Sequence, residues 1–246
     1  NDPTGLSSTV VSFMQGSLEV TNEDPIIGQS TEVLSDELKV RAKNHYATQN
    51  RAVTKKDYES IAYNMPKKFG SIKRVNVVND PMSTNRKLAL YVISENQNSQ
   101  LITTNSRIKE NLKSWLTQYK SINDQIEIFD AKIVNFGIDF EVSVDNRYSK
   151  DEVITNAINN LANKYSSKFY IGEAIYLTDV YNILVKTTGI VDVKKLKVFN
   201  KYGGNYSSTP FDFDKVISRD GSYYRIPKNV IAELKFSNED IKGTAK

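Results

Sequence analysis

The sequence predicts an α+β protein with two α/β modules, in which helices pack on small mixed sheets, and a C-terminal β-hairpin extension. Three observations support this fold class. Apolar residues recur about every 3.6 positions in 54–65 and 108–119, which indicates amphipathic helices. They alternate with polar residues along 135–145, as in a half-buried strand. Asp220-Gly221, between segments rich in aromatic residues, is a strong hairpin-turn signal.

The composition is that of a globular protein with a core of its own. The chain has 246 residues, of which 39% are hydrophobic and 25% are charged. It shows neither an apolar run of about 20 residues nor a basic start followed by an apolar segment, so we expect no membrane partner and no secretory signal. The absence of cysteine excludes disulfides and thiolate chemistry and fits folding in a reducing cytoplasm. The single histidine, His45, is expected to be an ordinary helix or surface residue.

The net charge is +4, and lysines occur in pairs at 55–56, 67–68 and 194–195. Basic patches attract phosphate backbones, but most such pairs are solvated surface residues. The sequence has no zinc-finger spacing and no ribonucleoprotein aromatic motif. We therefore expect no nucleic-acid partner, and we keep a basic nucleic-acid-binding module as an alternative.

The first 122 residues predict an arm and the first module. Residues 1–33 are Ser/Thr-rich with short apolar pieces, which predicts an extended N-terminal arm with short strands. Residues 34–122 form the first α/β module. Its predicted elements are a helix at 34–46, a helix at 54–65, a strand at 72–78, a polar turn at 79–85, a strand at 87–94, a polar loop at 96–100 and an amphipathic helix at 108–119.

The start of the second helix carries a local structural motif. Thr54 is placed to cap the helix while Asp57, three residues later, reaches back, as in a capping box. Tyr58 then begins the apolar stripe that continues to Met65. Arg51, just upstream, is expected to anchor the preceding loop through a carboxylate or backbone carbonyls.

Residues 123–200 form the second predicted module. The expected elements are a strand region at 125–134, an alternating strand at 135–145, a helix at 149–165 opened by a second capping box, a helix from 178 to a C-terminal Gly189, and a strand at 191–199. The pattern at 71–79 resembles that at 192–200, and each follows a helix with an Asp-aromatic phrase. An approximate internal repeat and a chance repetition of a common pattern both explain this similarity.

The segment 201–246 is predicted to be a β-hairpin extension, with a short element at 228–236 and a polar tail from 238 that frays. It is rich in aromatic residues, which present apolar area and, in tyrosine, a polar tip, as is typical of protein interfaces. The alternative is that they cover the open edge of their own core. The interface candidates are Tyr202, Tyr206, Phe211, Phe213, Tyr223 and Tyr224.

One pair of carboxylates could support acid–base chemistry. Asp139 and Glu141 share one face of a predicted strand, and paired carboxylates carry out glycoside hydrolysis in many enzymes. The simpler interpretation is the polar side of a half-exposed strand. A carbohydrate-active enzyme that uses this pair is therefore an alternative, and we assign no catalytic residue.

Two other patterns resemble ligand sites but lack the required spacing. Asp212, Asp214 and Asp220 suggest a calcium loop, yet they do not keep the EF-hand register of Gly and Glu. Gly203-Gly204 is not a phosphate loop because no Lys-Ser/Thr follows it. We expect no metal and no cofactor.

Several phrases resemble the baseplate J-like family of contractile phage tails. Within 28–79, Arg51-Ala52-Val53-Thr54 and Asp57-Tyr58-Glu59 match the family pattern, and 172–180 and 188–193 resemble its C-terminal helix and strand. The resemblance covers most of residues 28–200. It departs from the pattern at Gly28-Gln29-Ser30-Thr31-Glu32, which stands where the family has a double glycine and an acidic cluster, and it does not cover 201–246.

The resemblance implies a late structural protein of the virion, located in the tail baseplate and assembled in the host cytoplasm. Family members of the wedge type contact their own copies and other baseplate wedge proteins to form a ring around the central hub. They allow the baseplate to reorganise when the sheath contracts. The resemblance carries over no catalytic residue and no cofactor.

Overall fold

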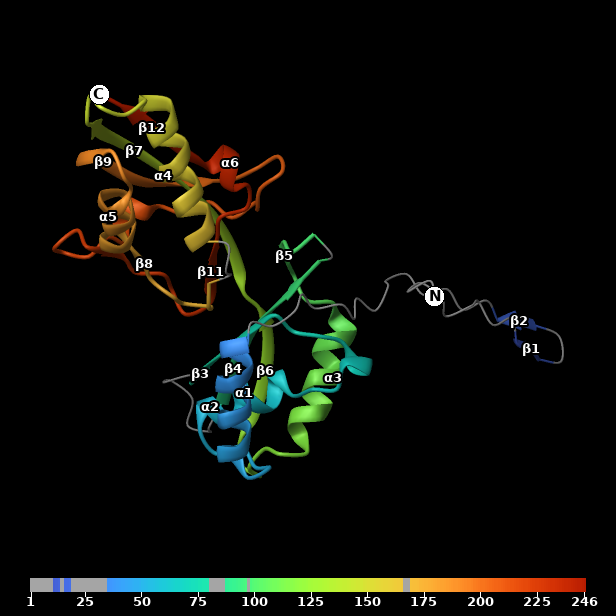
Figure 1. Cartoon of the computed structure of the whole chain (residues 1–246). Helices are drawn as coiled ribbons and strands as arrows, with labels where there is room; N and C mark the ends of the chain where they lie inside the picture. Colours follow the sequence, from blue (N-terminus) through green and yellow to red (C-terminus); the bar gives the residue numbers. More distant parts are fainter. Residues whose placement is uncertain (1–10, 14–15, 19–34, 80–86, 97, 166–168) are drawn as a thin grey trace. The chain divides into compact units, whose positions relative to one another are not determined.

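The computed structural model describes residues 11–13, 16–18, 35–79, 87–96, 98–165 and 169–246 (Figure 1). The chain divides into two compact units, Asn1–Asp130 (unit 1) and Ala131–Lys246 (unit 2). Each unit has its own hydrophobic core and its own mixed sheet, which confirms the predicted α+β class. None of the helices in the described ranges has the length and apolarity needed to cross a bilayer.

In the N-terminal region, β1 (Val11–Phe13) and β2 (Gly16–Leu18) pair antiparallel. The rest of the predicted arm lies outside the described residues. The same holds for the turn at 28–32 and for the polar turn after Asn79.

Unit 1 is a four-stranded sheet with helices on one face. The central strand β4 (Lys87–Glu95) pairs antiparallel with β3 (Arg74–Asn79) and β5 (Leu101–Ile102) and parallel with β6 (Gln125–Asp130). The helices of unit 1 are α1 (Ser35–Thr48), α2 (Lys55–Tyr63), the short η1 (Lys67–Phe69) and α3 (Ser106–Thr117). Alternate residues of the sheet pack against α2 and α3 in one core.

The parallel strand β6 determines where unit 1 ends. Two parallel neighbours need a crossover connection, and α3 supplies it between β4 and β6. Because β6 pairs with β4 from Gln125 to Asp130, these residues belong to unit 1, although the sequence placed them in the second module. The single strand region expected at 125–134 is therefore two strands, which separate at Ala131.

The central strand of unit 2 is β7 (Lys132–Val144), with different partners on its two edges. β9 (Ile190–Lys201) runs antiparallel along one edge. β11 (Val230–Glu233) and then β12 (Ile241–Ala245) run parallel along the other. The remaining elements are α4 (Lys150–Lys164), β8 (Ile175–Tyr176), α5 (Leu177–Lys186), η2 (Phe213–Lys215), β10 (Tyr223–Tyr224) and α6 (Ser237–Asp240).

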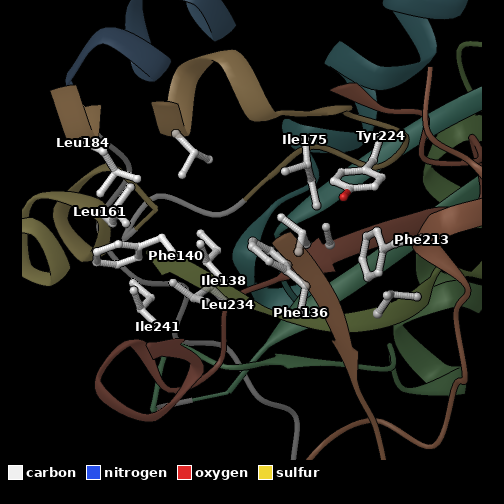
Figure 2. Packing of buried hydrophobic residues seen from close by; sticks show 14 of the residues in the cluster. Phe136, Ile138, Phe140, Leu161, Ile175, Leu184, Phe213, Tyr224, Leu234 and Ile241 are labelled. Carbon is white, nitrogen blue, oxygen red and sulfur yellow. The ribbon is translucent and has the colours of Figure 1, made fainter. Parts of the chain in front are cut away.

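The alternation of β7 builds the core of unit 2. Phe136, Ile138 and Phe140 point to one face and are buried, as the two-residue period predicted. Figure 2 shows Phe140 beside Leu161 of α4 and Leu184 of α5, both also buried. Burying each such side chain contributes about 1.5–3 kcal/mol.

β11 and β12 pair along the same edge of β7, and neither strand pairs with this edge at Gly137. β11 pairs with residues 132–135 of β7 and β12 with residues 138–142, so segment 234–240 leaves the edge between them. A Cβ on Gly137 would lie 2.6 Å from Cζ of Phe199 and 2.8 Å from the carbonyl oxygen of Asp240. Only glycine allows this close approach of the crossing backbone.

The C-terminal tail is not frayed, contrary to the prediction. Residues 238–246 contribute to α6 and β12, and Ile241 is buried against β7. The physical reason is the open edge of β7, whose unpaired N–H and C=O groups form a ready template for another strand. A polar local sequence does not reveal this pairing.

Two predicted helix ends also differ. Ser149 is the N-cap of α4, but its side chain makes no capping hydrogen bond, so the second capping box is wrong. Helix α5 ends at Lys186 with Thr187 as its C-cap. Gly189 lies two residues beyond that cap with φ +95°, a conformation that favours glycine.

The similar patterns at 71–79 and 192–200 correspond to β3 and β9. Each is an edge strand that follows a helix and runs antiparallel to a central strand with a parallel partner on its other edge. The order along the chain is reversed, because β3 precedes its central strand and β9 follows its own. The two units therefore share a sheet pattern without sharing a chain order.

Replacing Gly137 with Ala is expected to destabilise the protein by about 1–3 kcal/mol, because the added methyl group overpacks a site bounded by backbone. Equilibrium unfolding in urea would measure the loss. Ser143→Ala on the same strand is the matched control and should change stability by less than about 0.5 kcal/mol. Equal stability of the two variants would contradict the close approach at Gly137.

Candidate interaction surface

The motif at the start of α2 has a structural role within unit 1. The Asp57 N–H donates to Oγ1 of Thr54 (3.2 Å), and the Thr54 N–H donates to Oδ2 of Asp57 (2.8 Å), so the first capping box is present. Tyr58 is fully buried, and its hydroxyl donates to Oδ2 of Asp124 at 2.5 Å. The motif therefore fixes α2 against the segment that leads into β6.

Arg51 does not anchor the loop before α2 as expected. Its side chain is exposed and forms no ion pair within the described part of the chain. Ala52 anchors the loop instead, because its buried backbone N–H donates to the carbonyl oxygen of Tyr119 at 2.9 Å. The anchor is a backbone contact that local sequence does not indicate.

Of the two carboxylates on β7, Glu141 takes part in surface ion pairs. Glu141 lies 2.5 Å from Nζ of Lys246 and 3.7 Å from Nζ of Lys195. The hydrogen bond from Lys246 lowers the pKa of Glu141. Asp139 is exposed and lies opposite Lys197 of β9. A general acid needs a raised pKa, so this geometry favours the half-exposed strand over a hydrolytic site.

The other candidate metal ligands form contacts with neighbouring residues or lie alone on the surface. Asp212 accepts a hydrogen bond from the Asp214 N–H (3.1 Å) and pairs with Lys215 (3.0 Å), and the bond from Lys215 lowers the pKa of Asp212. His45 is exposed on α1. No group of three His, Cys, Asp or Glu side chains able to hold a metal occurs within the described ranges.

The aromatic interface candidates differ strongly in exposure. Tyr202 is 67% exposed, whereas Phe213 and Tyr224 are only 4% and 3% exposed. The other three are half-buried. Phe213 and Tyr224 are therefore unavailable to a partner, which corrects the candidate set for these two residues.

Phe213 and Tyr224 belong to the core of unit 2 (Figure 2). Their rings meet edge to face with centroids 5.3 Å apart, and Figure 2 shows Tyr224 beside Ile175. The Val198 N–H donates to the Tyr224 oxygen, and burial raises the pKa of Tyr224. These aromatics thus cover the sheet of their own chain, as the alternative interpretation held.

Tyr206 connects three parts of unit 2. Its hydroxyl donates to Oδ1 of Asp240 at 2.6 Å, and Nζ of Lys201 lies 3.0 Å from the same oxygen. The Phe236 N–H donates to the other oxygen of Asp240 at 2.8 Å. Asp240 is fully buried, so these three donors satisfy a carboxylate that would otherwise be costly to bury.

Tyr202 lies in a pocket of about 390 Å³ between the end of β9 and residues 210–214. The half-buried Phe211 also lines it, with Phe199 and Lys197 of β9. A pocket that combines aromatic rings and charged side chains is suited to receiving a side chain from another protein. Of the six candidates, Tyr202 has the exposure that such a contact requires.

Tyr223 has a neighbour that the sequence did not indicate. It pairs with Tyr176 across β8 and β10, and the two rings lie 5.6 Å apart. Tyr176 is 48% exposed, so the pair forms a second aromatic surface of unit 2. In the sequence, Tyr176 is only an aromatic residue just before a predicted helix. Its partner Tyr223 lies far away along the chain, so local patterns do not indicate the pair.

Comparison with known proteins shows a shared fold. No protein-family model and no curated protein match this sequence. One chain in the structure described as "Cryo-EM structure of the anti-feeding prophage (AFP) baseplate, 6-fold symmetrised" is similar, with a TM-score of 0.51 and 12% sequence identity. The similarity covers 92% of the present chain and 47% of that one, so the present chain spans about half its length.

The contrast between neighbouring tyrosines is directly testable. Tyr224→Ala is expected to lower the free energy of unfolding by about 3 kcal/mol or more, because a buried aromatic ring is lost from a packed core. Tyr223→Ala should cost no more than about 1.5 kcal/mol, the value of an aromatic pair. Urea denaturation would compare them. A similar loss in both variants would contradict the burial difference.

Asp220 at the hairpin turn should report on the pH dependence of that turn. Hydrogen bonds from Ser218 and Ser222 lower the pKa of Asp220 to about 2. The pKa of Asp220 in the folded protein lies below its value of about 3.9 in the unfolded chain. The ionised carboxylate therefore stabilises the folded state above pH 4, and this stabilisation is lost as the pH falls towards 2. NMR titration of the side-chain carboxyl would measure this. Ser222→Ala should raise the pKa, and an unchanged value would refute the hydrogen-bond explanation.

Proposed function

We propose that this protein is a structural subunit of a contractile-tail baseplate, located in the virion. The observation that carries the proposal is the fold similarity, over 92% of the chain, to a chain in the anti-feeding prophage baseplate structure. The family resemblance of residues 28–200, which rests on sequence phrases, supports the same role independently. Assembly would take place in the host cytoplasm.

More specifically, we infer a wedge subunit. The sequence also resembles, more specifically than the family pattern, the C-terminal part of the baseplate wedge protein of T-even phages, including residues 201–246, which the general family pattern leaves out. In this role the chain contacts its own copies and other wedge proteins in a ring around the central hub. The ring rearranges when the sheath contracts.

The geometry of the described residues favours a structural role over hydrolysis. The best carboxylate pair is Asp139 and Glu141, and the pKa of Glu141 is lowered by Lys246, which is the opposite of what a general acid needs. The aromatic surface at Tyr202 and the pair Tyr176–Tyr223 offer exposed rings with polar tips. Such residues supply much of the binding energy in protein interfaces.

The baseplate role predicts that the protein is a component of tails. Mass spectrometry of purified tails from particles that encode it should detect the chain in a fixed ratio to other tail proteins. A matched preparation of heads alone is the control and should lack it. Tails that form normally without the chain would overturn the proposal.

Self-association predicts a mass that rises with concentration. Light scattering after size exclusion, over about a hundredfold concentration range, should show species larger than the monomer. Tyr202→Ala should weaken this association about tenfold without changing the thermal midpoint, because Tyr202 is exposed and contributes little to the core. Tyr46→Ala, at an 88% exposed position in unit 1, is the matched control. Equal association of both variants would exclude Tyr202 from the interface.

A further inference from the structure

The hairpin turn of unit 2 borders a second pocket, of about 610 Å³, that is rich in positive charge. It lies between residues 215–219 and 225–228. Four of its lining side chains are cations, and none of the described residues that line it is Asp or Glu. The four cations are Lys215, Arg219, Arg225 and Lys228.

Among the described residues, Arg219 and Arg225 have no carboxylate partner, and the pair formed by Lys215 is weak. Lys215 pairs with Asp212 at 3.0 Å, but both side chains are at least half exposed, so the pair is weak. Arg225 donates to the neutral hydroxyl of Tyr223 at 3.5 Å. Arg219 forms no ion pair within the parts of the chain that the structure describes. The pocket therefore attracts a negatively charged partner.

The other residues that line the pocket indicate which kind of anion it can bind. Val216, Ile217, Ile226 and Pro227 contribute apolar surface, and Ile217 is 42% exposed. The hairpin holds this surface in place, because the Arg225 N–H donates to the Val216 carbonyl oxygen at 2.9 Å. None of the described lining residues is aromatic, so the pocket lacks the stacking platforms on which nucleic-acid bases bind. Its chemistry suits an acidic peptide with aliphatic side chains.

The chain itself contains a segment of that chemistry. Residues 1–34 include five carboxylates and no Lys or Arg, although the whole chain is basic. Four of these carboxylates lie within 19–32, together with Val20, Ile26 and Ile27. Charge complementarity and the aliphatic side chains both match the pocket.

We propose that the acidic segment 19–32 of a second copy of this chain docks in the basic pocket of unit 2. The inference rests on the proposed self-association and names two further surfaces that contribute to it. Carboxylates such as Glu23 and Asp24 pair with Arg219 and Arg225, while aliphatic side chains of the segment cover Ile217. Because the charges are near the surface, the association weakens as salt increases.

Reciprocal charge reversal tests this pairing in the full chain. The segment variant is Glu23→Lys/Asp24→Lys and the pocket variant is Arg219→Glu/Arg225→Glu. Each variant alone should self-associate at least tenfold more weakly than the wild type, because reversing two of the four charges removes the net charge of the altered surface and places like charges opposite each other at the proposed contacts. Mixing the two variants should restore association, since the unaltered acidic segment of one variant then meets the unaltered basic pocket of the other, and the reversed positions of the two variants carry opposite charges. Sedimentation equilibrium in low and high salt measures these affinities.

The matched control is Lys164→Glu/Lys186→Glu, which makes the same charge change at exposed positions of α4 and α5. It should associate like the wild type, and thermal midpoints of all variants verify folding. Association that persists in both reversed variants would overturn this inference and leave self-association through another surface intact. Pocket-dependent binding of a single-stranded oligonucleotide, without rescue on mixing, would also overturn it. A wild type that stays monomeric would overturn both proposals.

Discussion

The organisation of unit 2 depends on the buried carboxylate of Asp240. It lies at the point where the chain returns to β7 after leaving its edge, and it accepts hydrogen bonds from Tyr206, Lys201 and the Phe236 backbone. Lys201 belongs to β9 on one edge of β7, and Phe236 follows β11 on the other edge. The contact with Asp240 therefore fixes β9 and β12 in place beside β7. Gly137 completes the junction, because any larger residue would meet the Asp240 carbonyl. Removing Lys201 would leave the buried carboxylate of Asp240 without its positively charged partner.

This junction explains why the aromatic C-terminal segment serves two purposes. Part of it closes the core, since Phe213 and Tyr224 cover the sheet and Tyr206 satisfies Asp240. Once these positions are fixed, Tyr202 and the Tyr176–Tyr223 pair remain at the surface. Different residues of this aromatic segment therefore have different roles: the buried ones stabilise the fold, and the exposed ones are available to a partner.

The charge distribution fits the proposed role of the chain as an assembly protein. On the surface of the unit 2 sheet, Glu141 is neutralised by Lys246 and Lys195. Positive charge instead gathers around the hairpin turn, next to apolar surface. Two units with separate cores, a basic pocket and exposed tyrosines provide several surfaces for simultaneous contacts, as the proposed baseplate role requires.

The sequence alone determined the local features of this protein, because they depend on residues a few positions apart. The capping box of Thr54 and Asp57, the amphipathic α3 and the alternation of β7 are of this kind. Only the tertiary structure decided that the polar tail becomes β12 beside β7 and that Tyr224 is buried while Tyr223 is not. Those outcomes depend on contacts between segments that are distant in the chain. The open edge of β7 pairs with β12, and the buried carboxylate of Asp240 binds donors from residues more than 30 positions away.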